Sequence, residues 1–442
     1  MAGIGFNGPF EEQIIKSPLR VVFLSILMAV ILSGALGALA LIHPRSTWVL
    51  WGWIFFIIIL SAKELPLGHL LLPFMPYFVW LCFYLTWGLI VSPATDIAFA
   101  GKTVVTTIAL ATCMAVLTAK PHYLRTFANC AQFSVVANLV LWVLIPWSST
   151  ISTLLLKLAN QADPDFSGFT RYGGMLGNPN MLGYICLIAT VISILATPWI
   201  AWIGRLSSLP LLYLSASRKS SILYLVILIL YVIIVQRRNV RFWVSAAVLL
   251  FSLTMVLLLN DGLRAKSQSA TEDPAIARIM DLQEKEESMA GGETRVDLLH
   301  SWLSVLRDEP WYGYGLQTMS GTLYVEDHPD IVLMRAPYPT GTHNTYLGVW
   351  IDIGPVGFIA FIMVLLYYAR MCFFTEGDPI TKWVLVSILM VNLTFLFVSH
   401  NHLFCFEGKV AFALFFLLPS CAGLMGLGRS LTRNLESHPT LL

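Results

Sequence analysis

Residues 223–251, LYLVILILYVIIVQRRNVRFWVSAAVLLF, contain the pattern that decides the fold. Two apolar runs flank a short turn at 236–241, which carries three arginines and no acidic residue. Each run, followed to its polar limits at 219–235 and 241–259, approaches the roughly 20 residues that an α-helix needs to cross a bilayer. Basic residues gather in the short cytoplasmic loops of membrane proteins, so this turn is predicted to be cytoplasmic.

The same apolar pattern recurs along nearly the whole chain. Of its 442 residues, 57% are hydrophobic and 12% charged, and the mean hydropathy is +0.75, which excludes an ordinary soluble domain. Long apolar runs predict an all-α polytopic integral membrane protein, because a membrane β-barrel would show short alternating segments. The predicted transmembrane helices, about twelve, are 19–42, 46–62, 69–91, 97–118, 123–147, 179–197, 199–216, 219–235, 241–259, 343–369, 381–398 and 410–427.

Three regions follow from these helices. Residues 1–259 form a transmembrane bundle of about nine helices, 260–342 form one large polar loop, and 343–442 form a bundle of about three. Counting from the cytoplasmic turn places both termini in the cytoplasm and puts 148–178, 217–219 and 260–342 outside. The large loop is predicted to be partly helical, because Thr294 and Asp297 resemble a capping box and Pro310 stops the helix.

Three arginines lie on the predicted outer side, where the charge rule for membrane proteins does not account for them. They are Arg171 in RYGGMLGNPNMLG, Arg218 in SRKSS and Arg295 in ETRVDLLHSWL. Arginine offers a planar fork of donors that fits phosphate oxygens, so arginines from separate loops suit a diphosphate. Taken singly, each could equally pair a lipid headgroup or a nearby acid. Arg295 is expected to point inward, because it shares a helix face with Leu298 and Trp302.

The glycine-rich stretch after Arg171 precedes a predicted helix, with Asn180 expected as its N-cap. Gly173, Gly174, Gly177 and Gly183 would allow either close packing or close approach of a ligand, and the sequence does not separate the two.

His343 stands in GTHNTYLG, where the large loop meets the next apolar run. Its ordinary pKa near 6.5 suits a general base that activates a hydroxyl at neutral pH. A polar helix cap at the interface is the alternative. His400 and His402 have no suitable carboxylate partners and predict no metal site. Asp163 and Asp165 flank a proline and are typical of a turn.

In order, side and spacing, these motifs resemble those of the O-antigen ligase and polymerase superfamily of bacterial envelope proteins. The resemblance is carried by Arg171 before GGMLGNPNMLG, by the Ser217-Arg218 turn, and by Arg295 with Trp302, Pro310, Gly313 and Gly315. It continues through His343-Asn344, Tyr346, Leu347, Gly354 and Gly357. Within the superfamily the chain is most similar to O-antigen ligases.

The resemblance implies an inner-membrane glycosyltransferase that works on the periplasmic face with inversion, and without a metal ion, nucleotide or other cofactor. The donor would be O-antigen polysaccharide on undecaprenyl diphosphate, and the acceptor a sugar hydroxyl of lipid A–core. The implied roles are activation of the acceptor by His343 and binding of the diphosphate by Arg171, Arg218 and Arg295. Arg295 would also stabilise charge during the reaction. Acceptor or loop contacts are expected from Trp302, Tyr312, Asn344 and Tyr346, the expected partners are membrane lipids and the two glycolipids, and no nucleic acid is expected.

Three other functions remain open at this stage. An O-antigen polymerase and a protein O-oligosaccharyltransferase would use the same donor, so the arginines and His343 do not discriminate among them. The single large outer loop that ends in His343-Asn344 favours the ligase over the polymerase, and the lack of an added C-terminal periplasmic domain disfavours protein glycosylation. A lipid-glycan flippase or transporter is more remote, because it predicts charges near the middle of the bilayer, whereas these residues gather at one face.

Overall fold

The computed structural model is an all-helical bundle, and its described residues contain no strand. The described residues are 18–36, 39, 46–62, 67–91, 97–162, 172–215, 217–235, 311–316, 344–375, 378–398, 403 and 405–425. Every predicted transmembrane segment except 241–259 overlaps a helix, and 241–259 lies outside the described residues. The prediction of an all-α polytopic membrane protein is therefore confirmed.

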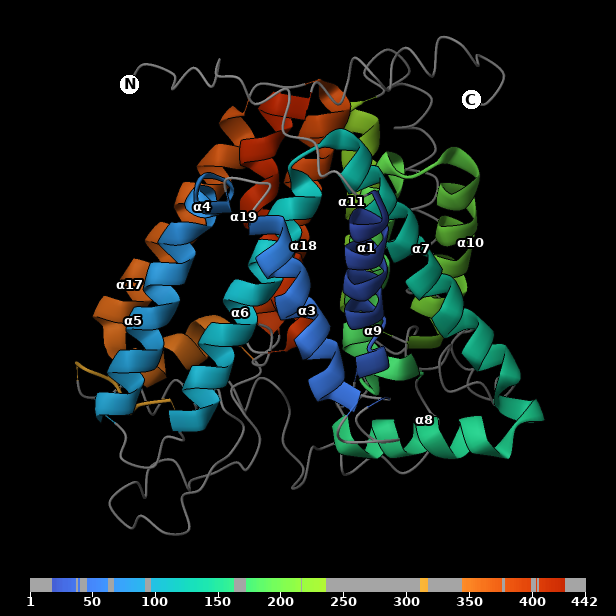
Figure 1. Ribbon diagram of the computed structural model, residues 1–442, viewed down its shortest axis with the longest axis horizontal. Helices are drawn as coiled ribbons and strands as arrows, with labels where there is room; N and C mark the ends of the chain where they lie inside the picture. Colours follow the sequence, from blue (N-terminus) through green and yellow to red (C-terminus); the bar gives the residue numbers. More distant parts are fainter. Residues whose placement is uncertain are drawn as a thin grey trace, which may run out of the picture.

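The long helices in the first half of the bundle run alternately up and down, and the last helix of this half lies across one end (Figure 1). They are α1 (Pro18–Leu32), α3 (Ser46–Ala62), α4 (Leu67–Leu71) with the 3-10 turn η2 (Leu72–Phe74), α5 (Met75–Val91), α6 (Ile97–Thr118), α7 (Pro121–Leu144) with η3 (Ile145–Trp147), and α8 (Ser149–Ala162).

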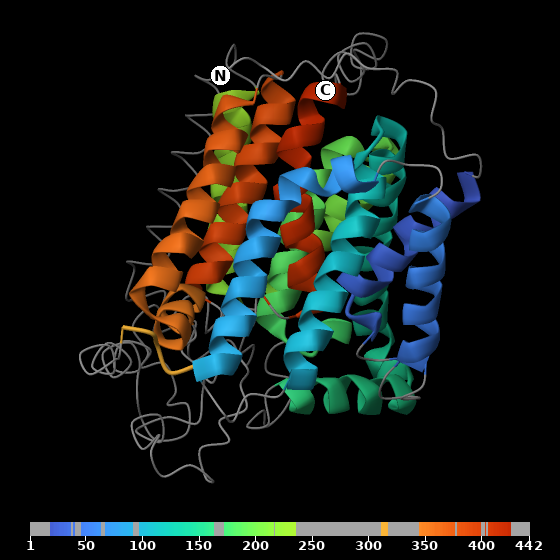
Figure 2. The ribbon, with the colours of Figure 1, turned by 60° about the vertical axis from the view of Figure 1, so that its left-hand side comes forward.

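The second half of the bundle begins at residue 172. It consists of η4 (Gly174–Leu176), α9 (Pro179–Ile192) with η5 (Ser193–Leu195), α10 (Pro198–Ser215), α11 (Arg218–Ile234), α17 (Thr345–Phe374), α18 (Pro379–Val398) and α19 (Phe406–Met425). In Figure 2 the bundle is turned by 60°, and α17 lies on the left-hand side, where it packs against both α5 and α18.

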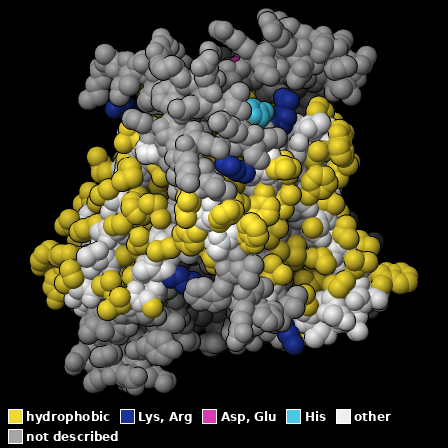
Figure 3. All heavy atoms as spheres, viewed as in Figure 1, with side chains coloured by type: hydrophobic (Ala, Val, Ile, Leu, Met, Phe, Trp, Pro, Cys, Tyr) yellow, Lys and Arg dark blue, Asp and Glu magenta, His cyan; other side chains and the backbone are white. Residues whose placement is uncertain are grey.

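Length and composition support a membrane location. Five described segments are long and apolar enough to cross a bilayer: Leu72–Val91, Ala100–Thr118, Pro121–Trp147, Thr345–Phe374 and Pro379–Phe397. On the face shown in Figure 3, hydrophobic side chains cover most of the described middle, and Lys and Arg side chains lie toward the top and bottom. The chain is thus a multi-pass membrane protein.

Helix α8 lies across one end of the bundle, at the bottom of Figure 1, and this end is called the α8 face below. Its sequence, STISTLLLKLANQA, places Leu155 and Leu158 on a buried face and leaves Lys157 exposed, as expected of an amphipathic helix at an interface. The sequence analysis treated 148–178 as an outer loop and did not predict this helix.

Helix α17 is too long to cross a bilayer straight. Its 30 residues would span about 45 Å as one rod, against about 30 Å of hydrocarbon. Gly354, at φ 71° and ψ 178°, and Pro355 break it after its first turns. The last twenty residues form the spanning part, and the first nine run along the α8 face (Figure 1).

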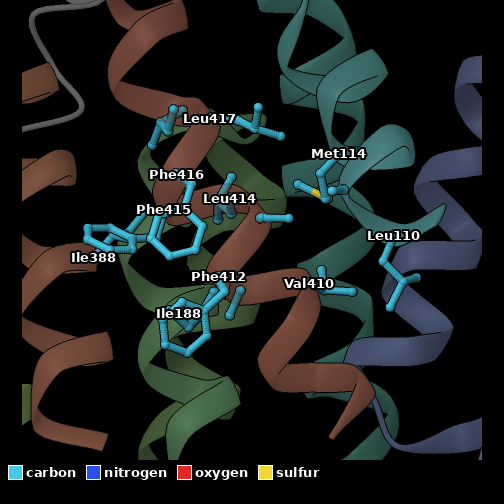
Figure 4. Close-up of a cluster of buried hydrophobic side chains, with 14 of the residues drawn as sticks. Leu110, Met114, Ile188, Ile388, Val410, Phe412, Leu414, Phe415, Phe416 and Leu417 are labelled. Atoms are coloured by element: carbon cyan, nitrogen blue, oxygen red, sulfur yellow. The ribbon is translucent and has the colours of Figure 1, made fainter. Parts of the chain in front are cut away.

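The core is centred on α19, which packs against α6, α18, α1 and α17. Figure 4 shows its phenylalanines between Leu110 and Met114 of α6, Ile188 of α9 and Ile388 of α18. The Phe416 ring lies 4.5 Å from the Tyr77 ring and 4.2 Å from the Tyr368 ring, measured between centroids. Lipid supplies no hydrophobic driving force between helices, so this packing is a main source of stability.

Replacement of Phe416, which is 0% exposed, tests the core. Phe416→Ala is expected to lower the free energy of unfolding by about 3 kcal/mol or more, because it leaves a cavity among aromatic rings. The matched control is Phe374→Ala, since Phe374 is 78% exposed at the end of α17. Thermal unfolding in detergent would measure both, and equal midpoints for the two variants would contradict this account of the core.

Candidate functional site

The end of α18, at 392–397, lies among the first turns of three other helices at the α8 face. The Tyr184 hydroxyl of α9 donates to Asn392 Oδ1 at 2.9 Å, and the Tyr184 and Phe395 rings are 4.5 Å apart. The Lys219 ammonium of α11 lies 4.8 Å from the centre of the Phe395 ring. The Tyr346 hydroxyl of α17 donates to the Leu393 carbonyl at 3.3 Å. The starts of α9, α11 and α17 therefore converge.

The start of α9 is fixed by an asparagine cap. Asn178 Oδ1 accepts from the backbone N–H of Asn180 at 2.9 Å and of Met181 at 3.3 Å, and Pro179 takes the first helical position. The prediction that Asn180 is the cap is wrong. Proline at the first position needs no N–H partner, so the residue before it becomes the cap.

The start of α11 packs directly on α9. Ser217 Oγ lies 2.9 Å from Ser220 Oγ and donates to Asn180 Oδ1 at 3.3 Å. A Cβ at Gly183 would lie 2.3 Å from Ser220 Oγ, so glycine is required for the two helices to approach. Arg218, the first residue of α11, and Lys219 therefore stand beside the start of α9.

The start of α17 is capped by Asn344, whose Oδ1 accepts from the Leu347 N–H at 3.1 Å. Together the three helix starts direct the positive ends of three helix dipoles toward one region. Such an arrangement, with cations beside it, favours phosphate groups and other anions.

The segment 172–178 is fastened to the neighbouring helices by Asn138 of α7. Asn138 Oδ1 accepts from the Met175 N–H at 2.9 Å, and its Nδ2 donates to the carbonyls of Ser33 at 3.2 Å and Ser134 at 3.0 Å. The Tyr172 hydroxyl donates to the Asn138 carbonyl at 2.7 Å. Burial raises the pKa of Tyr172, so this hydroxyl keeps its proton at neutral pH.

The glycines of this segment serve packing. Gly174 has a positive φ of 58°, and a Cβ there would lie 2.2 Å from Asn138 Oδ1. A Cβ at Gly173 would lie 2.4 Å from the Gly177 carbonyl oxygen. The sequence allowed either close packing or ligand approach at Gly173, Gly174 and Gly183, and the structure shows close packing at all three.

The described residues hold only part of the predicted site. Arg171, Arg295, Trp302 and His343 lie outside them, and the backbone but not the side chain of Arg218 is described. Asn344 and Tyr346 make the contacts given above. Tyr312 is exposed, and its carbonyl accepts from Trp87 Nε1 at 2.9 Å. At the level of chain position, Arg171 precedes Tyr172, Arg218 begins α11, and His343 precedes the cap of α17.

Two lysines with buried contacts were not predicted as site residues. Lys219 follows Arg218 and turns toward Phe395. Lys409, near the start of α19, is 5% exposed, and its Nζ donates to Thr106 Oγ1 at 2.7 Å. An ionisable residue inside an apolar helix is a signal that the sequence does contain. Among the side chains that the structure describes, no group of three His, Cys, Asp or Glu could hold a metal ion.

Residues 203–362 match a family model described as O-antigen ligase. Over these residues the chain is similar to that family. The match covers a little over a third of the chain and contains Arg218, Arg295, Tyr312, His343 and Tyr346, whereas Arg171 precedes it. No curated protein matches the chain in sequence.

Asn138 offers a test of how the segment after Arg171 is held. Asn138→Ala should lower the free energy of unfolding by about 2 kcal/mol, because it leaves the half-buried Met175 N–H and two carbonyls without these partners. Thr126→Ala on the same helix is the control, since that hydroxyl is exposed and bonds only to its own helix at His122. Thermal unfolding in detergent would compare the two variants, and an unchanged midpoint for Asn138→Ala would refute this role.

Proposed function

We propose that the chain is an O-antigen ligase of the bacterial inner membrane, with the α8 face toward the periplasm and both termini in the cytoplasm. It transfers O-antigen polysaccharide from undecaprenyl diphosphate to a sugar hydroxyl of lipid A–core. The observation that carries the proposal is the convergence of the α9, α11 and α17 starts around α18, partly within the segment that matches the family.

The diphosphate of the donor suits this region. It carries negative charge throughout the reaction, and helix starts and fixed guanidinium groups stabilise such charge without reorganisation. Arg218 begins one of the converging helices, and Arg171 precedes the fastened segment 172–178. Arg171, Arg218 and Arg295 are proposed to bind the diphosphate, and no metal ion is proposed to take part.

His343 is proposed to act on the acceptor. As the acceptor oxygen bonds to the anomeric carbon from the side opposite the diphosphate, the bond from that carbon to the donor phosphate oxygen breaks. The hydroxyl proton passes to His343, and the electron pair of the broken bond stays on the diphosphate. Attack from the opposite side inverts the anomeric configuration. Trp302, Tyr312, Asn344 and Tyr346 are proposed to line the path of the acceptor or to support it.

The acceptor decides among the ligase and its alternatives. Purified protein with undecaprenyl-diphosphate glycan should modify lipid A–core, and should leave a second lipid-linked glycan and a pilin protein unmodified. Transfer should persist in EDTA, because arginines take the place of a metal ion at the diphosphate. Elongation of the second glycan would identify a polymerase, and modification of pilin a protein O-oligosaccharyltransferase. Movement of the donor across vesicles without transfer would identify a flippase.

The division of labour between His343 and the arginines gives a second prediction. His343→Ala should lower turnover by about 10² to 10⁴ while donor binding survives. Arg218→Ala and Arg218→Lys should weaken donor binding and turnover together, because lysine keeps the charge but loses the bidentate fork. The control is Lys157, an exposed cation on α8, and Lys157→Ala should change neither quantity.

Donor binding and initial rates of folded, purified protein would measure these effects. Near-wild-type transfer by His343→Ala would show that His343 does not activate the acceptor. Normal binding and transfer in Arg171→Ala, Arg218→Ala and Arg295→Ala would remove the arginines.

A further inference from the structure

One short part of the large loop, 311–316, lies against the kink of α17. The Tyr314 N–H donates to the Ile351 carbonyl at 2.9 Å, and the Gly315 N–H donates to the Asp352 carbonyl at 2.8 Å. In a regular helix the Ile351 carbonyl would accept from residue 355, but that residue is Pro355, which has no N–H. The loop therefore supplies the hydrogen bond that the proline removes.

The contact leaves no room for side chains at two glycines. A Cβ at Gly313 would lie 2.4 Å from the Asp352 carbonyl oxygen, and a Cβ at Gly354 would lie 2.1 Å from the Trp311 carbonyl oxygen. Both glycines also have positive φ, 80° and 71°. Other residues would therefore separate the loop from α17, whatever their chemistry.

Helix α5 bonds to both sides of the contact between 311–316 and the kink of α17, which is called the junction below. The Tyr84 hydroxyl donates to Asp352 Oδ2 at 2.6 Å, and Trp87, on the same face of α5, donates from Nε1 to the Tyr312 carbonyl at 2.9 Å. A ring of contacts thus runs from the Asp352 carboxylate through α5 to Tyr312, and along 313–315 back to the Asp352 carbonyl.

Asp352 is 0% exposed and is the only acidic residue between His343 and Glu376. Burial of a carboxyl group is costly unless specific partners offset it, and an apolar residue would fill the space without that cost. A role in packing alone does not account for an aspartate at this position.

We propose that Asp352 is a positioning residue that holds residues 311–316 in fixed register with α17. The expected effect of Asp352 on glycan transfer rests on the proposed function. Arg295 lies sixteen residues before Trp311, and His343 lies nine residues before Asp352. The junction thus joins the chain that carries the diphosphate-binding arginine to the helix that follows the base.

Substitutions separate positioning from chemistry. Asp352→Asn keeps an acceptor oxygen for the Tyr84 hydroxyl, so transfer should stay within about threefold of wild type, whereas Asp352→Ala and Tyr84→Phe should lower turnover about 10- to 100-fold through misplacement. The double variant with Asp352→Ala and Tyr84→Phe should turn over little more slowly than Asp352→Ala alone, because both substitutions remove the same hydrogen bond. Tyr367→Phe, at an exposed tyrosine of α17, is the control. If Asp352→Asn is as inactive as Asp352→Ala, the carboxylate acts chemically and the proposal is overturned.

A cross-link tests the junction without any assay of transfer. A Cβ at Gly88 of α5 would lie 2.3 Å from Leu316 Cγ, which places the two Cβ atoms within the roughly 3.8 Å that a disulfide needs. Protein with Gly88→Cys and Leu316→Cys should lose two titratable thiols on oxidation with copper phenanthroline, and the single variants should lose none. Asp352→Ala should slow this loss, and Asp352→Asn should not.

The cross-linked protein then shows whether the register is fixed during turnover. Transfer that survives the disulfide supports the proposal. Failure to form the disulfide, or transfer that returns only on reduction, overturns it. If the wild-type protein transfers no glycan to any acceptor, the proposed function fails, while the thiol measurement still reports on the junction.

Discussion

Satisfaction of backbone hydrogen bonds within an apolar surrounding is the constraint on which this structure depends. Water is scarce at the depth of a membrane helix, so each broken turn and each helix start needs a partner from the protein. Pro355 opens α17, and 311–316 supplies the missing donors. The Asn138 side chain accepts a backbone hydrogen bond from the irregular segment 172–178. Asn178 and Asn344 cap α9 and α17.

These local solutions also determine what the α8 face can bind. Helix caps and close glycine contacts bring the starts of α9, α11 and α17 around the end of α18. The same backbone N–H groups that must be satisfied at helix starts make such a region attractive to anions. One arrangement thus stabilises the helix starts and supports the proposed binding of a diphosphate, to which Arg218 and Lys219 would add positive charge.

Most of the membrane-spanning fold was predictable because long apolar runs have few alternative structures in a bilayer. Helix α8 was missed because its apolar residues occupy one face only, and Asn178 was missed because proline shifts the cap by two positions. The link between Tyr84 and Asp352 joins residues 268 positions apart, and no local pattern predicts such a pair. Arg171, Arg295 and His343 remain predictions from motif and position, although the described chain beside two of them, at Tyr172 and Asn344, is well fixed.

The fit between 311–316 and the kink of α17 limits how this protein can be recombined with its relatives. The large loop looks like a separable insertion in the sequence, but its last described part completes the hydrogen bonding of a membrane helix. A chimera that exchanges the loop at its polar boundaries would leave the Ile351 carbonyl facing a foreign partner. The unit of exchange is the loop together with 351–357 and the α5 turn that carries Tyr84 and Trp87.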